Sequence, residues 1–244
     1  MKNNGESGWV HEKYWSPSGL KQSYTNEEYM KYSFDYGQFG QDFCINRILD
    51  IDNGFFLDIG AGVSDLDAET VLISTLSNTY GLEQFRDWNG IAIDYDEKYI
   101  QEAKKLRSCT MVCEDLMKVN INEILEKYNA PKKMDYLSFD VDAAQEKVFN
   151  ELDFSVYSFR AITYEHNLFL ADKSSDGPKI QKHHTESRKR FRDLGYKLLF
   201  GNVGLEPGQS VEDWYVDEEI FEKYKHVSFD NIIRNKIIAI LIKK

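Results

Sequence analysis

Short apolar runs alternate with longer amphipathic segments along most of the chain. The apolar runs are near-continuous rather than alternating with polar residues, as in strands that are buried on both faces. They predict six strands, within residues 54–60, 88–96, 109–115, 134–142, 159–167 and 196–203. The segments between them predict helices at residues 96–107, 121–128, 144–152 and 180–195, the last of which ends at a glycine suited to a helix C-terminus.

Strands that alternate with helices predict a parallel sheet with helices on both faces, the Rossmann-like form of the α/β class. Residues 212–216 predict a seventh strand that returns antiparallel beside the sixth, which makes the expected sheet mostly parallel and seven-stranded. The apolar segment at residues 235–244 fits either a further edge strand or a tail that docks on the domain.

The first 35 residues are polar but rich in aromatic side chains, among them Trp9, Tyr14, Trp15 and Tyr24. Disordered tails are poor in such residues. Residues 1–35 are therefore expected to form an N-terminal helical cap or lid, and residues 36–244 one globular domain.

Composition narrows the class of protein further. Of the 244 residues 42% are apolar, and the net charge of −11 argues against broad binding to nucleic acid or to an anionic membrane surface. No apolar run approaches the length of a membrane span, and the N-terminus has no signal-peptide core. Three cysteines without a CxxC pair favour core thiols in a reduced, cytoplasmic protein. The oligomeric state is not indicated.

The first predicted strand ends in a turn of small residues, Gly60, Ala61 and Gly62, preceded by Asp58. In a parallel sheet, ligands bind outside the carboxyl ends of the strands, where small residues let the backbone approach a ligand closely. The third glycine of a dinucleotide motif is absent here, and Asp65 follows instead. An ordinary strand-to-helix turn is the alternative.

Acidic residues end the next two strands. Asp94, followed by Tyr95, ends the second, and Glu114 and Asp115 end the third. A carboxylate at the first position accepts hydrogen bonds from ribose hydroxyls, and an acid at the second suits the adenine amino group. Each acid alone fits a solvated loop, but together they predict a cofactor that contains adenosine, either NAD or S-adenosylmethionine (SAM).

Four segments then resemble a known family. GFFLDIGAG resembles motif I of class I SAM-dependent methyltransferases, and the chain is more specifically similar to the FkbM-type family. The resemblance rests on YGQFGQDF (36–43), SNTYGLE (77–83) with WNGIAID (88–94), and MDYLSFDVDAAQEKVFNEL (134–152), and it covers roughly residues 36–200. It implies the class I methyltransferase fold, SAM as cofactor and methyl transfer to a hydroxyl, often of a sugar.

The resemblance also completes a set of expected cofactor contacts. The set comprises Gln41, Asp58, Gly60, Ala61, Gly62, Asn78, Asp94, Tyr95, Glu114, Asp115 and Asp140. Asp42 lies beside Gln41, where a polar helix start is the alternative. The family often has a glycine where this chain has Ala143, and an acid where it has Gln145. The role of that family acid is therefore not carried over to this chain.

A sugar hydroxyl is a poor nucleophile, so methyl transfer needs a base or a metal ion that lowers the hydroxyl's pKa. The ends of the fourth and fifth strands offer both. In a metal-dependent version Asp140, Glu165 and Asn167 would hold Mg²⁺, with Asp142 or His166 as the base. This resembles metal-dependent sugar O-methyltransferases. In a metal-free version His166 is the base and Asp140 orients it or contacts the cofactor.

Each of these assignments has a structural alternative. Asp142 would also serve as the N-cap of the following helix, and His166 as a hydrogen-bonded loop residue. The basic run from Lys179 to Arg192 is either a solvated helix face or a rim that receives an anionic acceptor. Trp214 and Tyr215 would stack on a sugar or lie buried in an edge strand.

The sequence thus predicts a SAM-dependent O-methyltransferase that acts on a carbohydrate or another small-molecule acceptor. Two alternatives stay open. One is a metal-dependent glycosyltransferase that uses the pair Asp140 and Asp142 for its metal. The other is a module that keeps the fold as an interaction scaffold without catalysis.

Overall fold

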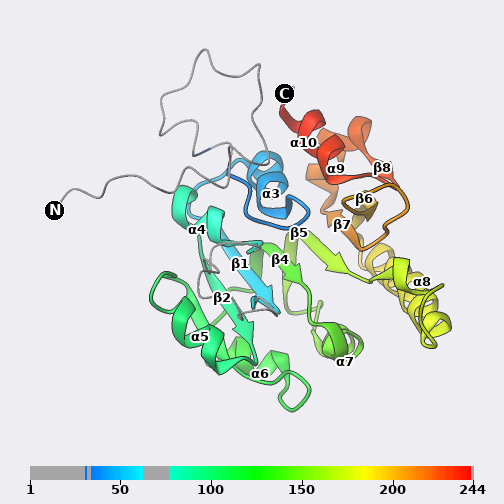
Figure 1. Ribbon diagram of the computed structural model, residues 1–244. Helices are drawn as coiled ribbons and strands as arrows, with labels where there is room; N and C mark the ends of the chain where they lie inside the picture. The colour runs from blue at the N-terminus through cyan, green and yellow to red at the C-terminus, as the bar shows by residue number, and fades with distance from the viewer. Residues whose placement is uncertain (1–30, 32–33, 63–76, 243–244) are drawn as a thin grey trace.

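The structure is a computed structural model that describes residues 31, 34–62 and 77–242 (Figure 1). The strands are β1 (Phe55–Ile59), β2 (Asn89–Asp94), β3 (Thr110–Cys113), β4 (Lys133–Phe139), β5 (Ser158–Glu165), β6 (Lys197–Val203), β7 (Glu212–Val216) and β8 (Phe229–Asp230). The helices are α3 (Gln41–Leu49), α4 (Tyr80–Arg86), α5 (Glu97–Ala103), α6 (Ile121–Lys127), α7 (Gln145–Glu151), α8 (Gly177–Asp193), α9 (Glu218–Tyr224) and α10 (Arg234–Ile242). Short 3-10 turns lie at Asp142–Ala144, Leu168–Leu170 and Lys225–Val227.

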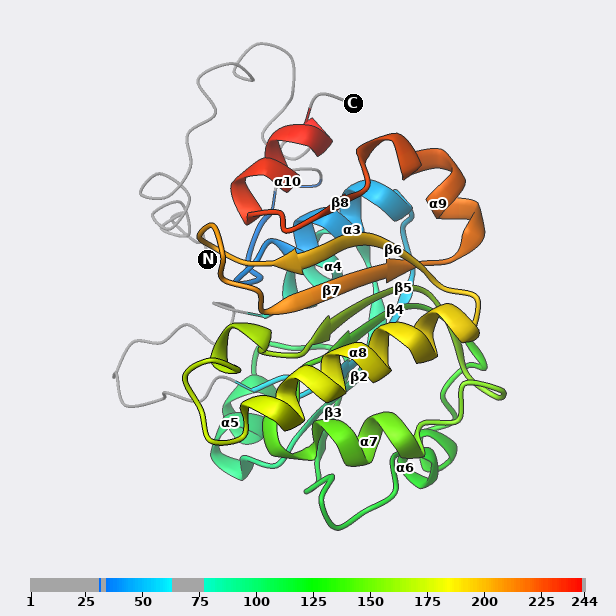
Figure 2. The same cartoon turned by 90° about the vertical axis from the view of Figure 1, so that its right-hand side faces the viewer.

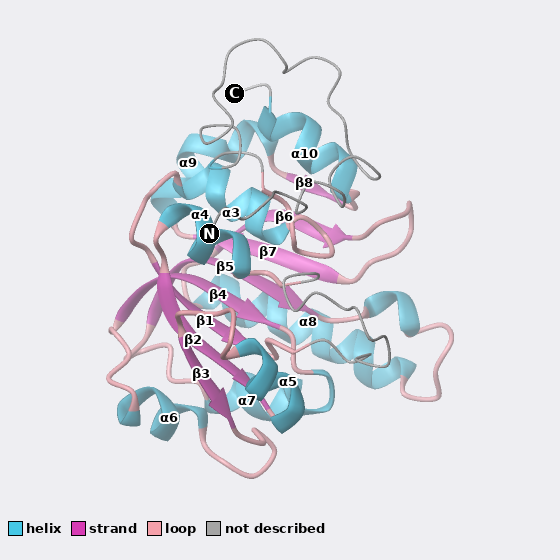
Figure 3. Cartoon of the chain, turned by 60° about the vertical axis from the view of Figure 1, so that its left-hand side comes forward, coloured by secondary structure: helices cyan, strands magenta, loops and turns pink. Residues whose placement is uncertain are grey.

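The described strands form one sheet in the order β3-β2-β1-β4-β5-β7-β6-β8 (Figure 3). Strands β1 to β5 are parallel, and β7 runs antiparallel between β5 and β6. The chain first moves outward from β1 to β3 and then returns to β4 on the other side of β1. Such a reversal of strand order opens a crevice at the carboxyl ends of the two central strands, where α/β proteins bind ligands.

Alternate side chains of the buried strands supply two apolar layers, one on each face. Phe56 of β1 belongs to the layer that packs against α3, α5 and α10 on one face of the sheet. Leu57, the next residue, belongs to the layer that packs against α6, α7 and α8 on the other face. Figure 2 shows α3, α9 and α10 on one side of the sheet and α7 and α8 on the other. Both faces are therefore covered, which explains why the strands are almost uniformly apolar.

The Rossmann-like α/β fold expected from the sequence is confirmed, including the antiparallel strand at residues 212–216. The expected number of seven strands is wrong, because β8 adds an eighth strand parallel to β6. β8 contains two residues, Phe229 and Asp230, and both are exposed. A strand this short shows no hydrophobic pattern in the sequence.

The C-terminal segment forms helix α10, so the docking alternative holds and the edge-strand alternative is wrong. Ile237, Ile238 and Leu241 are buried, and α10 packs against α3. Arg234 at its start forms an ion pair with Asp35, ahead of α3. The expected N-terminal cap (1–35) lies outside the described residues apart from residues 31, 34 and 35.

Replacing Ile238 with alanine should lower the free energy of unfolding by about 2–5 kcal/mol, because it leaves a cavity between α10 and α3. Ile238 is 2% exposed. Lys236→Ala is the matched control, since Lys236 is exposed on the same helix. Urea unfolding followed by circular dichroism measures both. Equal stability of the two variants would contradict the docking of α10.

Candidate active site

The carboxyl ends of β1 to β5 bring most of the predicted site residues to one edge of the sheet. Gly60, Ala61 and Gly62 follow β1, Asp94 ends β2, Glu114 and Asp115 follow β3, Asp140 follows β4, and Glu165 ends β5. The residues expected at the cofactor and at the acceptor therefore lie along the edge of the sheet where α/β proteins bind ligands.

The turn after β1 depends on the absence of a side chain at Gly60. Its φ is +83°, and a Cβ there would lie 1.5 Å from the backbone oxygen of Asp140. The amides of Gly60 and Ala61 both donate to the carbonyl of Ile93, at 2.9 and 3.0 Å. The turn is thus held between β2 and β4, at the point where the strand order reverses.

Asp94 is fixed by two backbone amides. Its Oδ2 accepts from the amide of Gly62 and its Oδ1 from the amide of Asp96, both at 2.8 Å. Burial raises the pKa of Asp94, and these two hydrogen bonds oppose that shift. Each carboxylate oxygen has two acceptor positions, so each retains one that a hydroxyl of a vicinal diol can use.

The residues beyond Asp94 are more open. Tyr95 is 77% exposed, and Glu114 and Asp115 are half-buried. Asp115 accepts from the amide of Met117 and pairs with Lys118 at 2.9 Å, and the bond to Lys118 holds its pKa below the usual value. Asp115 is therefore a charged acceptor at this end of the crevice.

Two expected cofactor residues have their polar groups engaged within the protein. Asp58 is 2% exposed, and its Oδ2 accepts from the hydroxyl of Thr79 at 2.6 Å. Gln41 accepts from the amide of Phe39 through Oε1 and donates to Glu212 through Nε2, at 2.9 and 2.7 Å. Asp58 therefore anchors the segment around Thr79, and Gln41 anchors the loop ahead of α3.

Asn78 is placed differently, because half of its amide has no partner. Its Nδ2 donates to the hydroxyl of Ser138 on β4 at 3.0 Å. Its Oδ1 is buried and has no hydrogen-bond partner in the described part of the chain. A Cβ on Gly37 would approach this oxygen to 3.0 Å, so the small residue keeps the surroundings of the oxygen clear.

Three carboxylates converge beside Gly60. Asp140, Asp142 and Glu165 each offer an oxygen within 4.8 Å of the others. Burial raises the pKa of Asp140, and burial together with the charge of Asp140 raises the pKa of Glu165 to about 10. Two carboxylates this close do not readily both ionise, so without a cation the pair favours holding one proton between Asp140 and Glu165.

Asp142 does not act as a helix cap. It has a left-handed φ of +42°, and neither the 3-10 turn that it begins nor α7 has a side-chain cap. It is exposed, unlike its two half-buried partners. The helix-cap alternative is therefore wrong, and Asp142 is the member of the cluster that an incoming molecule reaches most easily.

His166 belongs to a second cluster, with His184 and Asp213. Its side chain is buried, its Nε2 lies 3.5 Å from Asp213, and its ring packs on His184 at 4.4 Å. Its Nδ1 accepts from the amide of Leu168 at 3.1 Å, which assigns the proton of the neutral ring to Nε2. Burial lowers the pKa of His166. These contacts fit the alternative of a hydrogen-bonded loop histidine.

Two acids on β7 were not predicted from the sequence. Glu212 lies opposite Glu165 in the antiparallel pair, and its Oε2 accepts from the indole of Trp214 at 2.6 Å. Asp213 receives two hydrogen bonds from Arg188, each of 2.7 Å. The available signal was the presence of two acids in a strand that is otherwise aromatic and apolar.

The basic run on α8 is largely paired with acids. Lys179, Lys182 and Lys189 form ion pairs with acidic residues on or beside the same helix, and Arg188 pairs with Asp213. This fits a solvated helix face better than a rim for an anionic acceptor. Trp214 and Tyr215 are 3% and 2% exposed, so they lie in the core and do not form a stacking surface.

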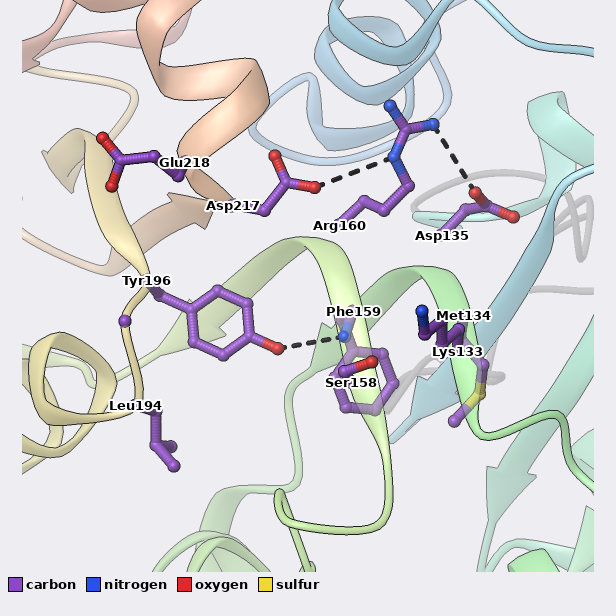
Figure 4. A pocket seen from close by; sticks show the side chains of 11 residues that line it. Lys133, Met134, Asp135, Ser158, Phe159, Arg160, Leu194, Tyr196, Asp217 and Glu218 are labelled. Atoms are coloured by element: carbon purple, nitrogen blue, oxygen red, sulfur yellow. Dashed lines mark hydrogen bonds and ion pairs between the residues drawn. The ribbon is translucent and has the colours of Figure 1, made fainter.

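A cavity of 370 Å³ lies at the opposite edge of the sheet, where β4 and β5 begin (Figure 4). Arg160 stands between Asp135 and Asp217 there, 3.8 Å from each. Tyr196 accepts from the amide of Phe159 at 2.9 Å, and Asp217 caps α9. The polar groups of this cavity thus hold the ends of strands and a helix, away from the candidate site.

Within the described residues, no helix is both long and apolar enough to cross a membrane. No family model matches the chain, and no curated protein matches it.

Several solved structures are similar in fold. A TehB-like SAM-dependent methyltransferase from Corynebacterium glutamicum has a TM-score of 0.44 at 13% identity, over 72% of this chain and 88% of that one. The methyltransferase domain of the bacterial protein CtHen1-C has a TM-score of 0.42 at 10% identity, over 73% and 97%. PKMT2 from Rickettsia typhi has a TM-score of 0.33 at 13% identity, over 67% and 31%. Likenesses this distant do not assign an activity to this chain. Any inference about its activity has to start from its own residues.

The stability of the protein should depend on the ionisation of Glu212. Burial, and next the charge of Asp140, raise its pKa from 4.5 to about 8. Between these values the folded state binds a proton that the unfolded state has lost, so stability falls by about 1.4 kcal/mol per pH unit as pH rises. In urea unfolding with EDTA present, Glu212→Gln should make the pH slope less steep by this amount, while Glu165 still contributes its own part. The same pH slope in both proteins would contradict the assignment.

Proposed function

We propose that the protein is a SAM-dependent methyltransferase of the FkbM type, which transfers a methyl group to a hydroxyl of a carbohydrate. One observation carries the proposal. The crevice at the reversal of strand order has a carboxylate suited to a diol, Asp94, on one side of Gly60 and a cluster of three carboxylates on the other. The first suits a ribose and the second suits an acceptor hydroxyl.

The acceptor groups along this edge of the sheet follow the same order as the hydrogen-bond donors along the SAM molecule. The ribose hydroxyls suit Asp94, and the adenine amino group suits Asp115, with Glu114 and the exposed Tyr95 nearby. The remaining donor, the ammonium group of the methionine part, suits the unpartnered Oδ1 of Asn78. Asn78 is bonded to β4, on the side of β1 away from β2. Gly60, Ala61 and Gly62 then allow the cofactor to cross β1 closely.

The reaction requires an acceptor oxygen that attacks carbon. The oxygen–carbon bond forms as the carbon–sulfur bond breaks, the electron pair of that bond stays on sulfur, and the hydroxyl proton leaves. SAM supplies the methyl group on a positively charged sulfur. Asp142 is the best placed of the cluster to take the proton, because it is exposed at the mouth of the cluster. His166 is less suited, since its Nδ1 lone pair is used by the amide of Leu168.

The cluster also fits a hard divalent cation. Asp140 and Glu165 would hold Mg²⁺ through carboxylate oxygens, the ligands that it prefers, and Asp142 beside them would take the proton. The ion would supply positive charge that lowers the pKa of a bound hydroxyl. A role for Asn167 as a further ligand stays a prediction. Asp140 and Glu165 would both be deprotonated when the ion is bound. Without the ion, the pair shares one proton.

A metal-dependent glycosyltransferase would use the same acids but gives no role to the glycine turn or to Asn78. Calorimetry separates the two activities, because the proposal expects SAM to bind and a nucleotide-diphosphate sugar not to bind. Asp94→Asn should weaken SAM binding about tenfold or more through loss of charged hydrogen bonds to the ribose. Asp87→Asn is the control, since Asp87 is exposed ahead of β2. Binding of UDP-glucose without SAM would favour the glycosyltransferase.

Asp142→Asn should lower kcat by about 10²–10⁴, the usual contribution of a general base, and leave the Kd for SAM unchanged. The assay follows formation of S-adenosylhomocysteine with a panel of sugar acceptors. Glu146→Gln, an exposed acid on α7, is the control. EDTA should abolish turnover and Mg²⁺ should restore it. Full activity in EDTA would rule out the metal, and an unchanged kcat in Asp142→Asn would rule out the base.

A further inference from the structure

A buried ion pair lies beneath the segment that carries Asn78. The side chains of Arg107 and Glu83 are both 0% exposed, and Nε of Arg107 donates to Oε2 of Glu83 at 2.7 Å. Removing two charges from water is costly, and apolar residues of similar volume usually serve stability as well or better. The pair therefore calls for an explanation other than stability.

The guanidinium of Arg107 contacts both neighbours of Asn78. Its Nη2 donates to the hydroxyl of Thr79 at 2.8 Å, and its Nη1 to the hydroxyl of Ser77 at 3.3 Å. Because Thr79 accepts this hydrogen bond, its own proton is directed to Asp58 of β1, at 2.6 Å. Arg107, Thr79 and Asp58 thus form a directed chain of hydrogen bonds that ties the segment to β1.

The same segment is tied to β4 through Asn78 itself. Nδ2 of Asn78 donates to Ser138, which pairs with Asp58 in the register of β1 and β4. Ser138 donates its own proton to the carboxylate of Asp58, so it accepts from Nδ2 of Asn78, and Oδ1 is the end left without a partner. With Ser77 and Thr79 held from below, this oxygen has a single available orientation.

We infer that Arg107 is a positioning residue for cofactor binding. It holds Ser77 and Thr79 so that Oδ1 of Asn78 accepts a hydrogen bond from the ammonium group of a cofactor with a methionine-like tail. This inference rests on the proposed function, because it takes SAM as the cofactor. Arg107 itself is buried and does not touch the ligand.

Two ligands distinguish positioning from general stability. S-adenosylhomocysteine carries the amino-acid tail, and 5′-methylthioadenosine lacks it but keeps the adenosine part. Thr79→Val breaks the chain of hydrogen bonds at similar volume, and Thr79→Ser keeps the hydroxyl. The double variant Arg107→Met/Glu83→Leu removes both buried charges together, so that neither is left unpaired. Thermal unfolding shows which variants are folded.

In calorimetry, Asn78→Ala, Thr79→Val and the double variant should each weaken S-adenosylhomocysteine binding about tenfold or more, the effect of losing a hydrogen bond to a charged group. Their affinity for 5′-methylthioadenosine should match that of the wild type, and Thr79→Ser should bind both ligands normally. If Thr79→Val does not fold, the double variant decides the outcome.

Equal weakening for the two ligands would overturn the inference, because it indicates a structural role alone. Unchanged S-adenosylhomocysteine binding in the folded double variant would also overturn it. If the wild-type chain binds neither ligand, the proposed function fails and the inference with it. That outcome is distinct, since in the first two cases the wild type still binds.

Discussion

The close approach of Gly60 to the backbone of Asp140 is the constraint on which the candidate site depends. The two residues follow the central strands β1 and β4, where the strand order reverses, and no side chain fits between them. A larger residue at this position would push the two strand ends apart. Asp94 on one side and the three carboxylates on the other would then no longer border a single crevice.

A second constraint is the cost of burying acids. The layer around the site contains Asp58, Glu83, Glu212 and Asp213, each at most 5% exposed. Each is hydrogen-bonded: Asp58 to Thr79, Glu83 and Asp213 to arginines, and Glu212 to Gln41 and Trp214. Buried acids persist only when they are paired or hydrogen-bonded. This supporting layer fixes the loops that carry the more accessible groups.

The sequence predicted the strands well because buried parallel strands are almost uniformly apolar. It did not predict β8, which is only two residues long, and it left α10 undecided because an apolar run rich in isoleucine fits a strand as well as a helix. Contact with α3 stabilises the helix. The carboxyl-edge positions of Asp94 and Asp140 followed from the same strand pattern.

The roles of individual polar groups were less predictable, because they depend on residues far away in the sequence. Gln41 was expected at the cofactor, but its amide is held by Glu212, which is 171 residues away. His166 was expected beside Asp140, but it packs on His184 and Asp213 instead. Spacing along the chain identifies strand ends, whereas hydrogen bonds between distant segments decide which atoms remain available to a ligand.

The most direct test of the account is a crystal structure of the protein with S-adenosylhomocysteine and Mg²⁺. The account predicts the ribose hydroxyls at Asp94, the amino group at Oδ1 of Asn78, and the metal ion between Asp140 and Glu165, with Asp142 beside it. A ligand bound elsewhere, such as in the cavity around Arg160, or a ribose that does not contact Asp94, would contradict it.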